Sequence, residues 1–227
     1  MRFGLIQVAL GIALIGVAAY VGDAAWALVW PGWSVGIVGL AYLGIGPRVF
    51  GKRADGGMSM LHVALLLPYY VVAWSLWQLK SRLQGENPHD EVAPGIIVGR
   101  RPLGEAEMPA AASVVVDLTS EFPRSAPTRA VARYECVPTL DTDAPDVDAF
   151  RALLDRLDGE EGPIFVHCAM GHGRSATVAA GLMVRRGVAT DVDDAIRRMT
   201  AARPRVHLHG VQRAAVGLVS MKQGELT

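Results

Sequence analysis

The stretch that decides the fold runs from residue 164 to residue 175 and has the sequence IFVHCAMGHGRS. Its first residues, Ile-Phe-Val, are typical of a buried strand, and the run ATVAAGLM that follows at 176–183 is typical of a helix. A strand, a tight loop and a helix N-terminus together form a cradle in which backbone N–H groups point toward an anion. The stretch therefore predicts an α/β fold with an anion site at the junction.

The loop of this cradle carries residue types that suit a phosphate group. Glycines at 171 and 173 permit backbone angles that other residues resist. Arg174 can turn a planar guanidinium toward two oxygens of one phosphate. Cys168 would lie at the floor of a positive loop, which favours the thiolate, the form in which cysteine is a nucleophile. The loop thus predicts nucleophilic chemistry on a phosphate ester.

Cysteine usage supports one functional thiol. The chain has two cysteines, Cys136 and Cys168, which cannot form a disulfide framework and do not have the spacing of metal ligands. We expect Cys168 to be reactive, Cys136 to be an inert core thiol, and the protein to use no metal and no cofactor.

The segment HCAMGHGRSA at 167–176 resembles the His-Cys-x5-Arg-Ser/Thr signature of the cysteine-based protein tyrosine phosphatase superfamily, in particular its dual-specificity branch. Beyond the cysteine and the arginine, the matching positions are His167, Gly171, Gly173 and Ser175. The resemblance covers about residues 92–220. It implies a dual-specificity-phosphatase-like central sheet flanked by helices.

The resemblance also implies roles for the loop residues. Cys168 would attack phosphorus and form a cysteinyl-phosphate, while Arg174 and the loop amides neutralise the equatorial oxygens. Ser175 would donate a hydrogen bond to the sulfur as the intermediate breaks down. The substrate-binding positions would be Ala169, Met170, Gly171, His172, Gly173 and Arg174.

The family supplies a proton to the leaving group from an aspartate on a separate upstream loop. Asp141 follows the strand-like VPTL directly, 27 positions before Cys168, and we favour it over Asp143. A surface or helix-capping carboxylate is the alternative for both, because the whole stretch is acidic.

Three further segments resemble family features. His167 would tune the cysteine or serve as a core histidine. The string ARPRVHLH at 202–209 would contact substrate or form a solvated loop, and DLTSE at 117–121 resembles a strand-end loop with a structural role. The loop at 168–174 has no lysine, which argues against a polyphosphorylated inositol substrate.

Periodicity in the C-terminal part favours strands that alternate with helices, and hence a largely parallel sheet. The predicted strands are 95–100, 113–118, 134–140 and 163–167, and the predicted helices follow 147–157, 175–187, 190–199 and 211–221.

The charge distribution divides the chain. It has 227 residues with 22 Lys or Arg and 22 Asp or Glu, and this zero net charge excludes a nucleic-acid-binding protein driven by bulk charge. Residues 1–80 contain seven of these charges and the rest of the chain contains 37. The sequence therefore predicts a membrane region at 1–80, a linker at 81–94 and a catalytic domain at 95–222.

Three apolar runs, 3–22, 25–46 and 59–79, are candidates for transmembrane helices. The first two predict a membrane hairpin, with a signal peptide or a buried soluble helix pair as alternatives. The third contains Pro68, so we leave open whether it spans, kinks or lies in the interface.

The basic loop at 47–57 favours the cytoplasmic side, and three full spans would then export the catalytic domain. A reactive thiolate and phosphoprotein substrates favour a cytoplasmic domain instead, and this is our expectation. Because arginine greatly outnumbers lysine, we expect a bacterial inner membrane.

These features predict an integral membrane phosphatase for phosphorylated protein or phospholipid head groups, with no nucleic acid partner. The alternative is a catalytically silent module of the same fold that recruits phosphorylated partners at the membrane. A sulfur-transfer or arsenate-reducing enzyme has only Cys136 as a further thiol.

Overall fold

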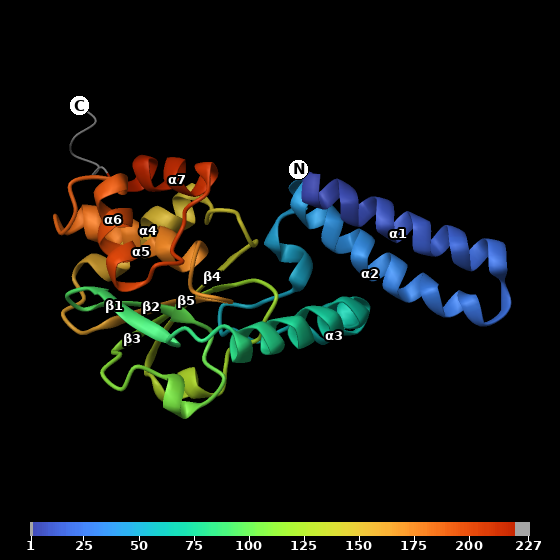
Figure 1. Cartoon of the computed structure of the whole chain (residues 1–227), viewed down its shortest axis with the longest axis horizontal. Helices are drawn as coiled ribbons and strands as arrows, with labels where there is room; N and C mark the ends of the chain where they lie inside the picture. The colour runs from blue at the N-terminus through green and yellow to red at the C-terminus, as the bar shows by residue number, and fades with distance from the viewer. Residues whose placement is uncertain (1, 221–227) are drawn as a thin grey trace. The chain divides into compact units, whose positions relative to one another are not determined.

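The computed structural model describes residues 2–220, so the predicted helix end at 221 and domain end at 222 lie outside the described residues. The chain divides into two compact units (Figure 1). One comprises Met1–Arg53 and Gly57–Gly85, and the other comprises Ala54–Gly56 and Glu86–Thr227. Each unit is described by itself.

The C-terminal unit is built on a five-stranded sheet in the order β1-β2-β5-β3-β4. The strands are β1 (His89–Ala93), β2 (Ile96–Arg100), β3 (Val114–Thr119), β4 (Arg133–Thr139) and β5 (Ile164–Cys168). Strand β1 pairs antiparallel to β2, and the other pairs are parallel. The four predicted strands and the largely parallel sheet are confirmed.

Strand β1 corrects the predicted linker. Residues 89–93 have the sequence HDEVA and pair with β2 at the edge of the sheet. An edge strand needs no continuous apolar run, because one side of it faces solvent, and so its polar start looked like a linker. The apolar helix before it also extends to Leu83, which leaves only residues 84–88 as connection.

Four helices cover one face of the sheet (Figure 1). They are α4 (Val147–Asp158), α5 (Arg174–Arg185), α6 (Val192–Ala202) and α7 (Gly210–Ser220). The side chain of Asp146 caps α4, and that of Asp191 caps α6. Gly187 follows the end of α5 with φ +68°, the left-handed conformation that glycine adopts at the end of a helix.

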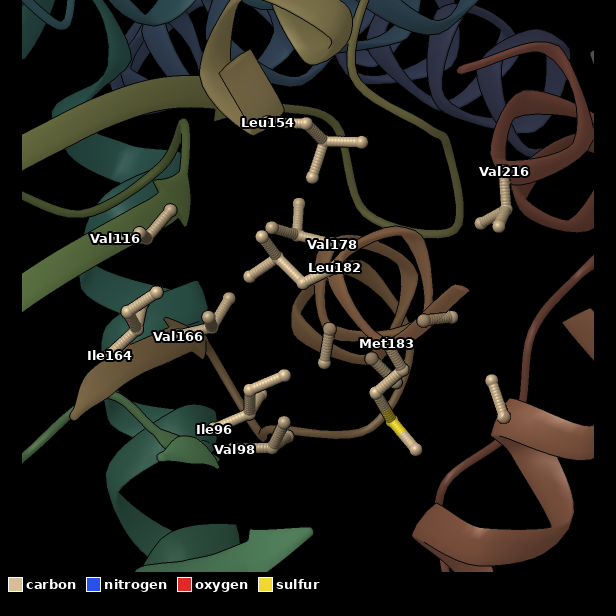
Figure 2. Packing of buried hydrophobic residues seen from close by; sticks show 14 of the residues in the cluster. Ile96, Val98, Val116, Leu154, Ile164, Val166, Val178, Leu182, Met183 and Val216 are labelled. Atoms are coloured by element: carbon tan, nitrogen blue, oxygen red, sulfur yellow. The ribbon is translucent and has the colours of Figure 1, made fainter. Parts of the chain in front are cut away.

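The core lies between the sheet and these helices. Figure 2 shows Val98 and Val166 of the sheet facing Val178 and Leu182 of α5. A second, smaller cluster on the opposite face contains Phe165. Because both faces are covered, β3 and β5 are buried along their whole length, which explains their continuous apolar sequences.

The N-terminal unit contains three helices that are long and apolar enough to cross a membrane, judged by length and composition. They are α1 (Arg2–Val21), the segment Asp23–Ile45, which includes α2 (Val29–Leu40), and α3 (Met60–Leu83). Helix α3 continues through Pro68 and so reaches the length of a full span.

Glycines allow α1 and α2 to pack closely. Gly4 and Gly11 of α1 are buried one heptad apart. A Cβ atom on Gly11 would lie 2.6 Å from the carbonyl oxygen of Gly32, and one on Gly4 would lie 2.8 Å from that of Gly39. A larger side chain at these positions would therefore force the helices apart.

A hydrogen bond links α2 to α3. The N–H of Tyr69, directly after Pro68, donates to Oγ of the fully buried Ser34 at 3.2 Å. In an apolar environment this bond satisfies two polar groups that would otherwise be costly to bury.

Candidate active site

The cradle predicted from the sequence is present at the end of β5. The strand ends at Cys168 and α5 begins at Arg174, so residues 169–173 form the loop. The sulfur of Cys168 accepts a hydrogen bond from the N–H of Gly171 at 3.2 Å and lies 3.4 Å from Oγ of Ser175. Cys168 therefore lies at the base of the loop, next to the N-terminus of a helix.

Gly171 is required by both conformation and space. Its φ is +76°, and a Cβ atom there would lie 2.4 Å from the carbonyl carbon of Gly99 in β2. The loop thus packs directly against the backbone of the neighbouring strand, which no side chain at this position would allow.

Arg174 is fully buried and its guanidinium is held in place. Its two terminal nitrogens donate to the two carboxylate oxygens of Glu121 at 2.9 and 2.8 Å, and one of them also donates to the carbonyl oxygen of Thr139 at 2.9 Å. Burial alone lowers the pKa of Arg174, but Glu121, together with the charge of Asp141, outweighs it and raises that pKa above its ordinary value. Arg174 is therefore a permanent cation.

One donor of Arg174 remains for a ligand. Within residues 2–220, its Nε is buried and has no hydrogen-bond partner. A buried N–H without an acceptor costs about 1–3 kcal/mol. An oxygen of a bound phosphate would supply that acceptor.

Glu121 is a site residue that the sequence reasoning did not identify, since segment 117–121 was assigned a structural role. It follows β3, which lies beside β5, so the carboxyl ends of both strands meet at the same edge of the sheet. Arg101 holds the next part of this loop by donating to the carbonyl oxygen of Pro123 at 3.3 and 3.2 Å. The position of an acidic residue directly after a predicted parallel strand could have indicated that Glu121 belongs to the site.

The two candidate acids differ in their contacts. Oδ1 of Asp141 lies 3.3 Å from a terminal nitrogen of Arg174, and its side chain is 68% exposed. The carboxylate of Asp143 accepts a hydrogen bond from the N–H of Ala144 and so stabilises its own turn. Asp141 is therefore the one of the two that lies next to Arg174, and its role as the acid stays a prediction.

Gln212 was also missed by sequence reasoning. This fully buried side chain of α7 donates to the carbonyl oxygen of Asp143 at 2.9 Å and accepts from the N–H of His209 at 2.9 Å. It thereby connects the loop that carries Asp141 to α7.

His167 is a fully buried residue behind the nucleophile. Its Nδ1 lies 4.0 Å from Oδ1 of Asp117, and its ring lies 5.5 Å from that of Phe165. Asp117 also accepts a hydrogen bond from the hydroxyl of Tyr134, whose pKa is raised by burial and by the Asp117 charge. The core alternative for His167 is therefore supported, and tuning of Cys168 stays a prediction.

The segment 202–209 is not a uniformly solvated loop, so the prediction of a solvated loop for this segment is wrong. Arg203 is 1% exposed and bonds to the carbonyl oxygens of the phosphate loop. His207 and His209 are exposed, and the ring centroid of His207 lies 6.4 Å from that of His172 in the loop. Arg203 therefore supports the phosphate loop from inside the domain, and His207 lies exposed near that loop.

In the part of the chain that the structure describes, no cluster of three or more His, Cys, Asp or Glu side chains is arranged to hold a metal ion. Within residues 2–220, neither Cys136 nor Cys168 forms a disulfide bond.

Comparison with known families identifies the domain. The family model for the "Swiss Army Knife protein, DSP-PTPase phosphatase domain" matches residues 97–218, more than half of the chain. The chain belongs to this family. The DSP-PTPase domain so defined contains the phosphate loop, Glu121, Asp141, Arg203 and Gln212. No curated protein sequence matches the chain.

Solved structures share the fold of the DSP-PTPase domain. PTPMT1 in complex with PI(5)P is similar with a TM-score of 0.50 and 15% identity, over 59% of this chain and 94% of that one. Tk-PTP in its active form gives a TM-score of 0.51 and 22% identity, over 59% and 96%. The human tyrosine phosphatase-like serine/threonine/tyrosine-interacting protein gives 0.50 and 14%, over 58% and 95%. These similarities show a mixed α/β fold of the dual-specificity phosphatase type.

Proposed function

We propose that this protein is a membrane-anchored phosphatase that hydrolyses phosphate monoesters through a cysteinyl-phosphate intermediate on Cys168. The observation that carries the proposal is the arrangement around one loop. The thiol of Cys168 lies at the base of this loop. The buried Arg174 has an Nε donor that makes no hydrogen bond in the described part of the chain, and Asp141 lies beside Arg174 with an exposed carboxyl group.

In the first step, the thiolate of Cys168 attacks phosphorus. A phosphorus–sulfur bond forms while the bond from phosphorus to the ester oxygen breaks, and Asp141 donates a proton to that leaving oxygen. Arg174 and the loop N–H groups bind the equatorial oxygens, on which charge is spread in the transition state.

In the second step, water attacks phosphorus and the phosphorus–sulfur bond breaks. The Asp141 carboxylate, formed in the first step, accepts a proton from the water. Ser175, with its Oγ at 3.4 Å from the sulfur, donates a hydrogen bond that stabilises the departing thiolate. Inorganic phosphate leaves, and Cys168 and Asp141 return to their starting protonation states.

The substrates we propose are phosphoproteins, at Tyr, Ser or Thr, or phospholipid head groups. Anchoring by the three apolar helices raises the effective concentration of substrates at a membrane. PTPMT1, which shares the fold, has been solved in complex with PI(5)P. We place the protein in a bacterial inner membrane with the catalytic domain in the cytoplasm. This orientation requires either that α3 does not fully cross the membrane or that α1 inserts against the charge bias of the loops. Labelling of Cys168 in intact cells by a membrane-impermeant thiol reagent would contradict that orientation.

The proposed activity is tested with the full chain in detergent, p-nitrophenyl phosphate and a reducing agent. We expect Cys168→Ser to lower the rate by about 10³-fold or more, because the nucleophile is lost. Cys136→Ser is the matched control and should keep the rate. Equal inactivity of the wild type and Cys168→Ser would refute the proposal.

Tight tungstate binding without turnover would instead identify the silent binding module. A phosphate-release screen that compares lipid vesicles with phosphopeptides then separates the two substrate classes.

A further inference from the structure

The residues that connect α3 to β1 bind the outer side of the phosphate loop. Helix α3 ends at Leu83, and only two residues separate it from Glu86, which begins the longer segment of the C-terminal unit. Glu86 and Asp90 lie before residue 97, where the family match begins. They belong to the C-terminal unit but not to the part of it that defines the family.

Arg203 is the centre of these contacts. Its Nε donates to the carbonyl oxygen of Gly171 at 2.8 Å, and one terminal nitrogen donates to that of Met170 at 3.3 Å. Its other terminal nitrogen donates to Oδ2 of Asp90 at 2.7 Å. The guanidinium, which is almost completely buried, thus bridges the phosphate loop and β1.

Glu86, in the segment that connects α3 to β1, contacts both Arg203 and the phosphate loop. Its Oε2 accepts a hydrogen bond from Nε2 of His172 at 2.7 Å and lies 3.5 Å from a terminal nitrogen of Arg203. His172 belongs to the phosphate loop itself. The connecting segment therefore contacts the loop both directly and through Arg203.

The direction of these bonds matters for phosphate binding. Arg203 binds the carbonyl oxygens of Met170 and Gly171, so these two C=O groups point toward Arg203. In a planar trans peptide the N–H group of the next residue points the opposite way, and therefore away from Arg203. A buried guanidinium without its carboxylate partners would be an uncompensated charge. Asp90 and Glu86 thus stabilise the arrangement in which Arg203 keeps the loop oriented for an anion.

We propose that Glu86 and Asp90 are positioning residues of the phosphate cradle, acting through Arg203 and His172, so that the segment following α3 is a working part of the catalytic site. The inference rests on the proposed function, because it assumes that the loop binds phosphate. Neither carboxylate contacts the reacting atoms. Their loss should weaken the binding of phosphate in ground state and transition state alike.

The test uses the full chain in detergent and two readouts. Tungstate binding is measured by calorimetry in a Cys168→Ser background, and hydrolysis of p-nitrophenyl phosphate is measured with Cys168 intact. We expect Glu86→Ala and Asp90→Ala each to raise the Kd for tungstate and the KM about tenfold, as for the loss of one charge-assisted hydrogen bond, with kcat within about twofold. Arg205→Gln, an exposed charge two residues beyond Arg203, should change neither.

Glu86→Gln separates positioning from folding, because it keeps an oxygen acceptor for His172. We expect it to restore most of the tungstate affinity that Glu86→Ala loses. An unchanged Kd in both Glu86→Ala and Asp90→Ala, even with a lower binding stoichiometry, would overturn the inference, because the carboxylates would then only help the chain to fold. A wild type that binds tungstate in a Glu86-dependent way but hydrolyses nothing would uphold the inference and reject the proposed function.

Discussion

Glu121 binds Arg174 through both carboxylate oxygens, although 53 residues separate them in the sequence. The pair is buried, so the carboxylate fixes the orientation of the guanidinium before any ligand arrives. Because Nε takes no part in the pair, Arg174 keeps a donor for phosphate.

We predict that Glu121→Ala destabilises the protein by about 3 kcal/mol, since it leaves a buried charge without its partner. It should also raise the KM for p-nitrophenyl phosphate. Thermal unfolding and steady-state kinetics check the two effects. Glu105→Ala, at an exposed position, is the matched control. Wild-type stability and kinetics in Glu121→Ala would show that the pair does not organise the site.

Substitution of the two candidate acids, Asp141 and Asp143, should lower kcat to clearly different extents. We expect Asp141→Asn to lower kcat for phenyl phosphate by about 10²-fold or more, because general acid catalysis is lost, and Asp143→Asn to lower it much less. The effect of Asp141→Asn should shrink with p-nitrophenyl phosphate, whose leaving group needs less protonation. The opposite ranking would assign the acid role to Asp143.

Folding stability should depend on pH through two histidines. Burial lowers the pKa of His89 and of His172, against the opposing influence of Asp90 and Glu86 respectively. The unfolded chain therefore binds more protons, so this stability is fully present above the unfolded pKa of about 6.5 and is lost as the pH falls below it. Calorimetric unfolding between about pH 7.5 and pH 5.5 measures the slope. His172→Gln should flatten the slope, and Arg205→Gln, which removes an exposed charge but no histidine, should not. Equal slopes in all three proteins would contradict this prediction.

The α1–α2 pair offers a test of helix packing. Gly11→Leu should destabilise the N-terminal unit by about 1–3 kcal/mol, because the added side chain meets the backbone of α2. Gly16→Leu is the control, since no atom beyond the nearby backbone of α1 itself lies within 4 Å of a Cβ atom at that position. Unfolding in detergent, followed by tryptophan fluorescence, compares the variants. Equal stability would mean that the two helices do not pack as described.

The sequence was informative where function depends on neighbouring residues. The phosphate loop is continuous in the chain, so Cys168 lies 3.4 Å from Ser175 and α5 begins at Arg174, while the catalytic roles of these residues stay predictions. The apolar runs likewise predicted the three long helices, since length and composition are local properties.

The missed residues depend on pairing between distant segments. Glu121 reaches Arg174 only because β3 lies beside β5, and a local sequence pattern does not predict the order of strands in a sheet. Arg203 looked solvated because it belongs to a basic string with Arg205, His207 and His209, yet Asp90 and the loop carbonyls compensate its burial. Strand β1 was missed for a similar reason, since its polar residues suit a strand only at the edge of a sheet.

The most direct measurement of the central claim is mass spectrometry of the Cys168 peptide after acid quench of the full chain turning over phenyl phosphate. Ser175→Ala should slow the breakdown of the intermediate, because its Oγ lies 3.4 Å from the sulfur. We predict that Cys168 carries one phosphoryl group in this variant during turnover and loses it when the substrate is exhausted. Continued turnover with Cys168 unmodified at every time point would contradict a cysteinyl-phosphate mechanism.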